Sequence, residues 1–222
     1  MKQRQYNLDK TAYDLEKENK RFIWKFFTYL YFLLFSLRNF KEIYIMCGII
    51  GFTGNLQAPG ILVDGLQQLE YRGYDSAGIA VNNGSETKIV KTTGKVATLR
   101  EKVEATADLA GTCGIGHTRW ATHGGVTEVN AHPHVSGNVT LIHNGIIENY
   151  KELAASLKTK GFTAISETDT EVAAMLIDSL YDGDPFAALK EADQMLEGAY
   201  GFCVMFKDHP GEIYCMRNAS PL

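Results

Sequence analysis

From Gly48 onward the chain alternates short apolar segments with amphipathic ones, and this order allows few folds. Strands are expected at 48–53, 77–81, 88–91, 113–118, 139–143, 200–206 and 212–216. Helices are expected at 58–71, 96–103, 149–160, 168–181 and 185–196. Because strands come in adjacent pairs and helices in adjacent runs, helix layers on antiparallel sheets are favoured over a doubly wound parallel sheet. The 222 residues suffice for one packed domain with one core.

The composition argues against several classes of protein. The net charge is −4 with acids and bases interspersed, so no broad cationic face is available for nucleic acid and none is expected as a partner. The four cysteines lie far apart in the sequence with no CxxC pair, which suits neither a disulfide framework nor a zinc knuckle. A reducing, cytoplasmic location fits this pattern best.

The first 46 residues differ from the rest and contain an aromatic run at 22–37. Lys25 interrupts the run. Roughly 16 helical residues reach only ~24 Å, short of a hydrocarbon core of about 30 Å. No small-residue cleavage site follows, so neither a signal peptide nor a stable membrane association is expected. We interpret 1–46 as an N-terminal extension, from a wrongly chosen start or a segment that is removed.

Cys47 follows Met46 directly at the start of an apolar strand. The ordinary interpretation of such a cysteine is a small buried apolar residue. If translation starts at Met46 and that methionine is removed, the thiol and the α-amine belong to one residue, which then carries both a nucleophile and its base. An α-amine has a pKa of about 7.7 to 8.0, which suits general-base catalysis near neutral pH. With residues 1–46 attached, the same nitrogen is an amide without basicity.

Two arginines lie at glycine-rich turns. Arg72 precedes Gly73 between a helix and a strand, where the ordinary interpretation is a solvated arginine and a left-handed glycine cap. Arg119 lies where a strand meets a turn, and its guanidinium has the geometry to bind a carboxylate through two parallel hydrogen bonds. Thr122 and His123 would add single bonds. The alternative for Arg119 is an ordinary surface residue.

Two further stretches carry polar groups at element ends. Asn144-Gly145 ends an expected strand and is ordinarily a turn, yet the Asn144 amide and the Gly145 N–H would also form two neutral donors for an oxyanion. Thr168 or Asp169 is expected to be the N-cap of the following helix. Asp169 would alternatively accept the ammonium of an amino acid. Together with Arg119, it would specify an α-amino acid.

Five of the six histidines fall between residues 117 and 143, which raises the question of a metal site. The region has no HExxH motif, and His132-Pro133-His134 would hold its two imidazoles poorly for one tetrahedral ion. We therefore expect no metal here. The five are His117, His123, His132, His134 and His143.

The motifs taken in order resemble the glutamine-fructose-6-phosphate aminotransferases, a family of class II glutamine amidotransferases. The resemblance covers 46–222. It rests on Met-Cys-Gly-Ile-Ile-Gly-Phe from 46, Leu-Glu-Tyr-Arg-Gly-Tyr-Asp-Ser-Ala-Gly from 69, His-Thr-Arg-Trp-Ala-Thr-His-Gly from 117, His-Asn-Gly-Ile-Ile-Glu-Asn from 143 and Ser-Glu-Thr-Asp-Thr-Glu from 166. It implies the α+β fold of the N-terminal nucleophile hydrolases, a four-layer sandwich with two antiparallel sheets between helix layers.

The resemblance also implies a role for each site residue. Cys47 would attack the side-chain amide of glutamine, and Asn144 and Gly145 would form the oxyanion hole. Arg119, Thr122 and His123 would bind the α-carboxylate and Asp169 the α-ammonium. Arg72 and Trp120 would shape the pocket around the thiol. No metal or organic cofactor is implied, and the whole proteins of the family are expected to be homodimers.

The resemblance leaves alternatives and two departures. Purine-pathway and asparagine-pathway amidotransferases tend to carry His-Arg-Gly-Gln or His-Arg-Gly-Pro where this chain has Tyr71-Arg-Gly-Tyr74, which favours the amino-sugar family. The first departure is that residues precede the nucleophile; an inactive fragment with an internal Cys47 is the remaining alternative. The second is that the sugar isomerase domains, which would bind fructose 6-phosphate, are absent. Residues 47–222 are thus expected to be a glutaminase domain incomplete at its C-terminus.

Overall fold

The structure is a computed structural model that describes residues 47–73, 75–121 and 124–220. All of them belong to one compact unit. The expectations on 1–46, including the aromatic run, and on Thr122 and His123 lie outside the described residues. Within the described ranges, no helix is long and apolar enough to cross a membrane.

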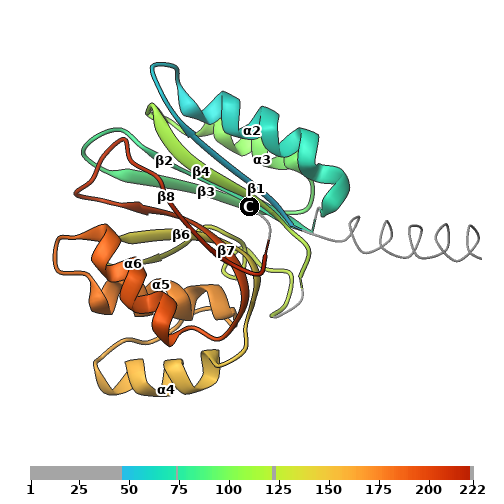
Figure 1. The fold of residues 1–222 in the computed structure, drawn as a ribbon. Coiled ribbons are helices and arrows are strands. Elements are labelled where there is room, and N and C mark those ends of the chain that lie inside the picture. Colours follow the sequence, from blue (N-terminus) through green and yellow to red (C-terminus); the bar gives the residue numbers. More distant parts are fainter. Residues whose placement is uncertain (1–46, 74, 122–123, 221–222) are drawn as a thin grey trace, which may run out of the picture. The chain divides into compact units, whose positions relative to one another are not determined.

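Two four-stranded sheets form the centre of this unit (Figure 1). Every neighbouring pair of strands within each sheet is antiparallel. The first sheet has the order β1 (Gly48–Thr53), β4 (Cys113–Arg119), β2 (Ser76–Asn82), β3 (Thr87–Thr93). The second has the order β5 (His134–Ser136), β6 (Val139–Ile147), β7 (Gly198–Phe206), β8 (Tyr214–Asn218).

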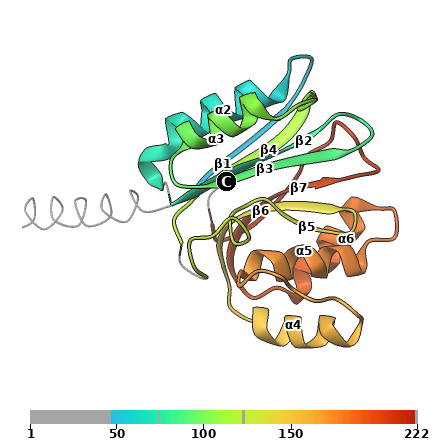
Figure 2. The same cartoon turned by 180° about the vertical axis from the view of Figure 1, so that it is seen from behind.

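Helices cover the outer face of each sheet, as Figures 1 and 2 show from opposite sides. The first sheet carries α2 (Ala58–Leu69), the 3₁₀ turn η1 (Glu70–Arg72) and α3 (Val96–Ala105). The second carries α4 (Tyr150–Thr159), α5 (Asp169–Leu180) and α6 (Pro185–Met195). This arrangement confirms the expected α+β sandwich of two antiparallel sheets between helix layers.

The single core expected from chain length is divided into three apolar layers, because two sheets present four faces and each needs a partner. One layer lies between the first sheet and α2 and α3. A second lies between the other sheet and its helices. The third fills the space between the sheets with side chains such as Ile115, Ile142 and Met205. Strand alternation then fixes which residues share this inner layer.

Three local expectations were wrong. The strand expected to end at His143 continues to Ile147, because β7 pairs with β6 along its whole length. The short strand β5 was not expected, since three residues carry no periodic signal. Gly73 is not a left-handed cap: its φ is 176°, and a Cβ there would lie 3.1 Å from the Cβ of Trp120.

Two of the cysteines that are far apart in the sequence lie next to each other in the fold. Cys203 and Cys215 are directly opposed on β7 and β8, with 3.7 Å between their sulfurs. Both are free thiols, Cys203 buried and Cys215 exposed. The hydrogen bond with Cys203 lowers the pKa of Cys215.

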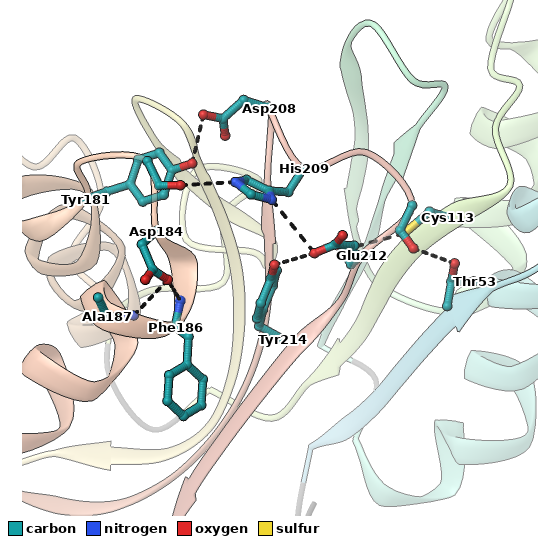
Figure 3. A network of polar contacts seen from close by, with 12 residues as sticks. Thr53, Cys113, Tyr181, Asp184, Phe186, Ala187, Asp208, His209, Glu212 and Tyr214 are labelled. Atoms are coloured by element: carbon teal, nitrogen blue, oxygen red, sulfur yellow. Dashed lines mark hydrogen bonds and ion pairs between the residues drawn. The ribbon is translucent and has the colours of Figure 1, made fainter.

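The turn between β7 and β8 is bonded to both halves of the sandwich (Figure 3). Tyr181, at the end of α5, donates to Asp208 at 2.7 Å. On the other side, Thr53 of β1 donates to the carbonyl of Gly211 at 2.7 Å. Tyr214 donates to Glu212 within the turn. These bonds connect the turn to α5 on one side and to the first sheet on the other.

Asp178 of α5 connects the helix layer to the turn between β5 and β6. Its carboxylate accepts from the Ser136 hydroxyl at 3.0 Å and from the Asn138 N–H at 2.9 Å. Gly137 lies between them with φ +47°, and a Cβ there would come within 2.3 Å of the carboxylate oxygens. The turn therefore depends on both the glycine and the carboxylate.

Replacing Asp178 by Ala is expected to lower the free energy of unfolding by about 1–2 kcal/mol, because two hydrogen bonds from polar groups of the turn are lost. Asp178→Asn keeps an acceptor for the Asn138 N–H and should cost clearly less. Urea unfolding followed by circular dichroism measures both. Asp182→Ala, at an exposed position four residues further along the chain, is the control and should change stability by less than ~0.5 kcal/mol. Equal losses for Asp178→Ala and Asp178→Asn would contradict the assigned bonds.

Candidate active site

Cys47 lies at one end of the inner layer, next to the end of β4. The register of β1 and β4 pairs Gly48 with Thr118, so the residue before Gly48 is carried to the residues that follow Thr118. The Trp120 N–H accordingly points at the Cys47 sulfur, 3.2 Å away. The Gly48 N–H donates to the Thr118 hydroxyl at 3.1 Å and fixes the chain beside the cysteine.

The environment of Cys47 keeps its thiol protonated. Burial is the largest influence and raises the pKa of the thiol above its ordinary value of 9.0. The Trp120 N–H acts in the opposite direction, the Asp75 carboxylate raises the pKa further, and the Arg119 guanidinium lowers it. The net shift is upward, so the sulfur needs a base before it can attack as a thiolate.

Asn144 approaches Cys47 from the second sheet. Its Nδ2 donates to the Cys47 carbonyl oxygen at 2.9 Å. Its Oδ1 lies 3.1 Å from Nε2 of His117 on β4. Strand alternation explains the placement, because Asn144 shares the inward face of β6 with Ile142. The nucleophile thus comes from one sheet and the side-chain amide from the other.

Gly145 follows Asn144 within β6 and faces solvent. Its φ is +132°, and a Cβ at this position would lie 2.0 Å from the Ala199 carbonyl oxygen. Both conditions require glycine. The exposure of Gly145, and not its lack of a side chain, leaves the backbone beside Asn144 accessible.

Asp169 lies close to the same stretch of β6. Its Oδ2 accepts the Ile147 N–H at 2.8 Å, and the residue is almost fully buried. The expectation left open whether Thr168 or Asp169 caps the helix. Thr168 does, since its hydroxyl accepts the Glu171 N–H, while Asp169 is the first residue of α5. Asp169 is thus free of the capping role.

Arg119 ends β4 and is 4% exposed, so it is not an ordinary surface arginine. Nη1 donates to the Gly125 carbonyl at 3.2 Å and Nη2 to the Gly124 carbonyl at 3.4 Å. Trp120 follows it and is 43% exposed. Thr122 and His123 lie outside the described residues, as does the side chain of Arg72, whose backbone belongs to η1.

Comparison with protein families identifies the part of the chain to which most of these residues belong. Residues 117–222, which include Arg119, Asn144, Gly145 and Asp169, match a glutamine amidotransferase domain. Residues 117–222 belong to a glutamine amidotransferase domain. The match starts after Cys47, which is placed next to these residues by the register of β1 and β4.

Alignments with related proteins cover more of the chain and include Cys47. The chain is 52% identical to the glutamine–fructose-6-phosphate aminotransferase (isomerizing) of Thermus thermophilus and 51% identical to that of Idiomarina loihiensis, over 80% of its length in each case. The aligned part is 29% and 30% of those relatives. The chain thus spans about a third of their length.

Solved structures confirm the fold of the amidotransferase domain. The glutamine phosphoribosylpyrophosphate amidotransferase from B. subtilis, complexed with ADP and GMP, superposes with a TM-score of 0.62 and 30% identity. The superposition covers 72% of this chain and 35% of that one. The sandwich is that of the N-terminal nucleophile hydrolases.

The sequence did not reveal two residues of the amidotransferase domain that hold the segment after Trp120. Asn130 donates from Nδ2 to the Gly125 carbonyl and to Glu167, each at 3.0 Å. Glu167 also accepts the Gly125 N–H at 3.0 Å. The Gly125 N–H and then Asn130 lower the pKa of Glu167. Asn130 is a polar loop residue that is only 3% exposed, and the sequence alone carries no sign of that burial.

Asp75 was also missed. It follows the Tyr-Arg-Gly-Tyr motif and accepts the Ala121 N–H, directly after Trp120. The Asp75 N–H in turn donates to the Arg119 carbonyl at 3.1 Å. Asp75 therefore fixes the backbone on both sides of Trp120, whose N–H points at the thiol.

Four of the five histidines noted in the sequence are buried near the site. His117 and His132 have ring centroids 4.0 Å apart, and His132 and His134 5.0 Å. Burial lowers the pKa of each, to about 3 for His117 and His134 and about 4 for His143. Among the described residues no group of three or more His, Cys, Asp or Glu side chains is arranged to hold a metal ion. The cluster is neutral at physiological pH.

Proposed function

We propose that this domain hydrolyses glutamine to glutamate and ammonia with Cys47 as the nucleophile. The observation that carries the proposal is the convergence of the Cys47 sulfur, the Trp120 N–H and the Asn144 amide at the end of the inner layer. A protonated thiol beside neutral donors suits attack on an uncharged amide, whose oxygen gains negative charge as the bond forms.

The proposed steps need a free α-amine on Cys47. The amine takes the thiol proton as the sulfur attacks the side-chain carbonyl carbon, and the oxyanion is held by Asn144 Nδ2 and the Gly145 N–H. The amine then gives that proton to the leaving nitrogen, which departs as ammonia and leaves a glutamyl thioester. Water attacks the thioester, the amine accepts its proton, and glutamate leaves as the thiol is restored.

Glutamine is positioned by its α-amino-acid group in this proposal. Arg119 binds the α-carboxylate through its guanidinium, and Asp169 accepts a hydrogen bond from the α-ammonium at Oδ1. Thr122 and His123 add bonds to the carboxylate. Arg72 and Trp120 line the pocket beside the thiol. In this proposal, the residues in contact with Cys47 determine which bond is broken, and those near Arg119 determine that the substrate is an α-amino acid.

We further infer that the ammonia aminates fructose 6-phosphate to give glucosamine 6-phosphate. The support is the name shared by the relatives at 51–52% identity, a value above the 30% identity to the phosphoribosylpyrophosphate amidotransferase structure. The acceptor sugar would bind to a part of the protein outside 47–222. The absence of a cofactor, dimerisation and a cytoplasmic location stay predictions.

The test is release of glutamate and ammonia from glutamine by a form that begins at Cys47, with intact mass confirming that residue as the first. Activity that a thiol-reactive glutamine analogue abolishes, with one analogue bound at Cys47, supports the proposal. The control is Cys47→Ala, which should release no glutamate and bind no analogue. A folded form that begins at Cys47 and leaves glutamine intact would refute it.

The pH dependence follows from the two groups on Cys47. The base works when unprotonated, so kcat/KM should rise with pH through about 7.7–8.0 and fall away below it. The thiol, whose pKa is raised above 9.0, stays protonated over this range. Glutaminase rates from pH 6 to 9 at constant ionic strength give the midpoint. A midpoint at or above pH 9 would show that thiol ionisation, and not the amine, limits the reaction.

A further inference from the structure

His117 lies fully buried between the two sheets and makes contact with the proposed oxyanion donor, yet it has no part in the steps above. Strand alternation places it on the inward face of β4, two residues before Arg119. Its Nε2 lies 3.0 Å from the His143 carbonyl oxygen and 3.1 Å from Asn144 Oδ1. Its contacts therefore cross from the first sheet to β6 of the second.

The contacts assign every proton in this group. The atom of the Asn144 amide that faces the Cys47 carbonyl at 2.9 Å must be Nδ2, because a carbonyl oxygen only accepts. Oδ1 then faces His117. Since Nε2 of His117 faces two oxygen acceptors, it must carry the ring proton, and Nδ1 is unprotonated. Among the described residues Nδ1 has no hydrogen-bond partner, as this tautomer allows.

A side-chain amide has a broad torsional well, so Asn144 needs two contacts to fix its plane. The Cys47 carbonyl holds Nδ2 on one side, and the His117 N–H holds Oδ1 on the other. One Nδ2 hydrogen is used by Cys47. The second then has a fixed direction, and the proposed mechanism requires it to reach the oxyanion.

We propose that His117 is a positioning residue, which donates from Nε2 to Asn144 Oδ1 and so holds the Asn144 amide in the orientation that stabilises the oxyanion. The inference rests on the proposed function, because His117 would act on the reaction only through Asn144. Burial keeps the imidazole neutral, with its pKa near 3, so the donor is present throughout the pH range of the assay. Within the described residues, the hydrogen bonds of His117 go to the His143 carbonyl and to Asn144, and not to Cys47 or Asp169.

The experiment compares His117→Gln with His117→Asn in the form that begins at Cys47. Both are neutral amides, but the Gln nitrogen reaches the position of imidazole Nε2 and the Asn nitrogen reaches only that of Nδ1. His117→Asn should lower kcat about 3- to 30-fold with KM unchanged, the size of one lost hydrogen bond and less than the loss of the donor itself. His117→Gln should stay within about threefold of the parent.

Two controls separate positioning from stability. His134→Gln changes an equally buried imidazole of the same cluster, bonded to the Thr168 hydroxyl, and should leave kcat within about twofold. In the Asn144→Ala background, adding His117→Asn should lower kcat by less than about twofold further, because the side-chain amide that His117 positions has been removed. A loss through KM, a failure of Gln to rescue, or full additivity with Asn144→Ala would overturn the inference. An inactive parent would instead refute the proposed function.

Discussion

Adding a single glycine before Cys47 is expected to lower glutamine hydrolysis by about 10²–10⁴-fold, the contribution of a positioned general base. The glycine converts the Cys47 nitrogen from an amine to an amide and changes nothing else in the site. Residues 1–46, which make the same peptide bond, should have the same effect. The measurement is glutamate release by three forms that differ only before Cys47, each identified by intact mass.

The one-residue extension is the sharper of the two comparisons. It leaves the thiol, the Trp120 N–H and Asn144 in place, so an excess of a small reagent should still alkylate Cys47 to completion. A matched extension therefore separates loss of the base from blocked access. If the glycine-extended form hydrolyses glutamine at the parent rate, another group is the base and the proposed mechanism is wrong.

Asn144→Ala is expected to lower kcat by about 10²–10³-fold, the usual loss for one oxyanion donor, with little change in KM. The variant removes Nδ2 from beside the thiol while Arg119 and Asp169 remain. Steady-state glutaminase kinetics give kcat and KM separately. Thermal unfolding should show a loss of about 1 kcal/mol, because the bonds to Cys47 and His117 disappear together.

Asn144→Asp is the isosteric counterpart of this change. It keeps the shape of the side chain but replaces the donor with a carboxylate, which repels a developing oxyanion, so it should be at least as inactive as Asn144→Ala. An Asp variant that keeps the parent kcat, or an Ala variant that changes KM alone, would show that Asn144 binds glutamine and does not stabilise the oxyanion.

Much of the fold was predictable because local physics decides it. The hairpin at 82–84 forms as expected, since Asn82 accepts the Gly84 N–H and Gly84 takes φ +96°. Helix α6 begins where Asp184 accepts two N–H groups ahead of its first turn. The C-terminal end of β6 was not predictable in this way: an Asn-Gly pair favours a turn, but pairing with β7 across nine residues outweighs that preference.

The sequence alone determined the chemistry available to this protein: a cysteine next to a methionine, an arginine at the end of a strand, an amide beside a glycine that tolerates no side chain. Only the tertiary structure decided which groups meet. Asn144 and Cys47 lie 97 positions apart and touch because two sheets face each other, and His117, Asp75 and Asn130 gained roles from burial and contact. The alternation of residues along a strand predicts which face of the sheet a side chain occupies. Which side chain it meets on the opposite sheet depends on how the two sheets pack.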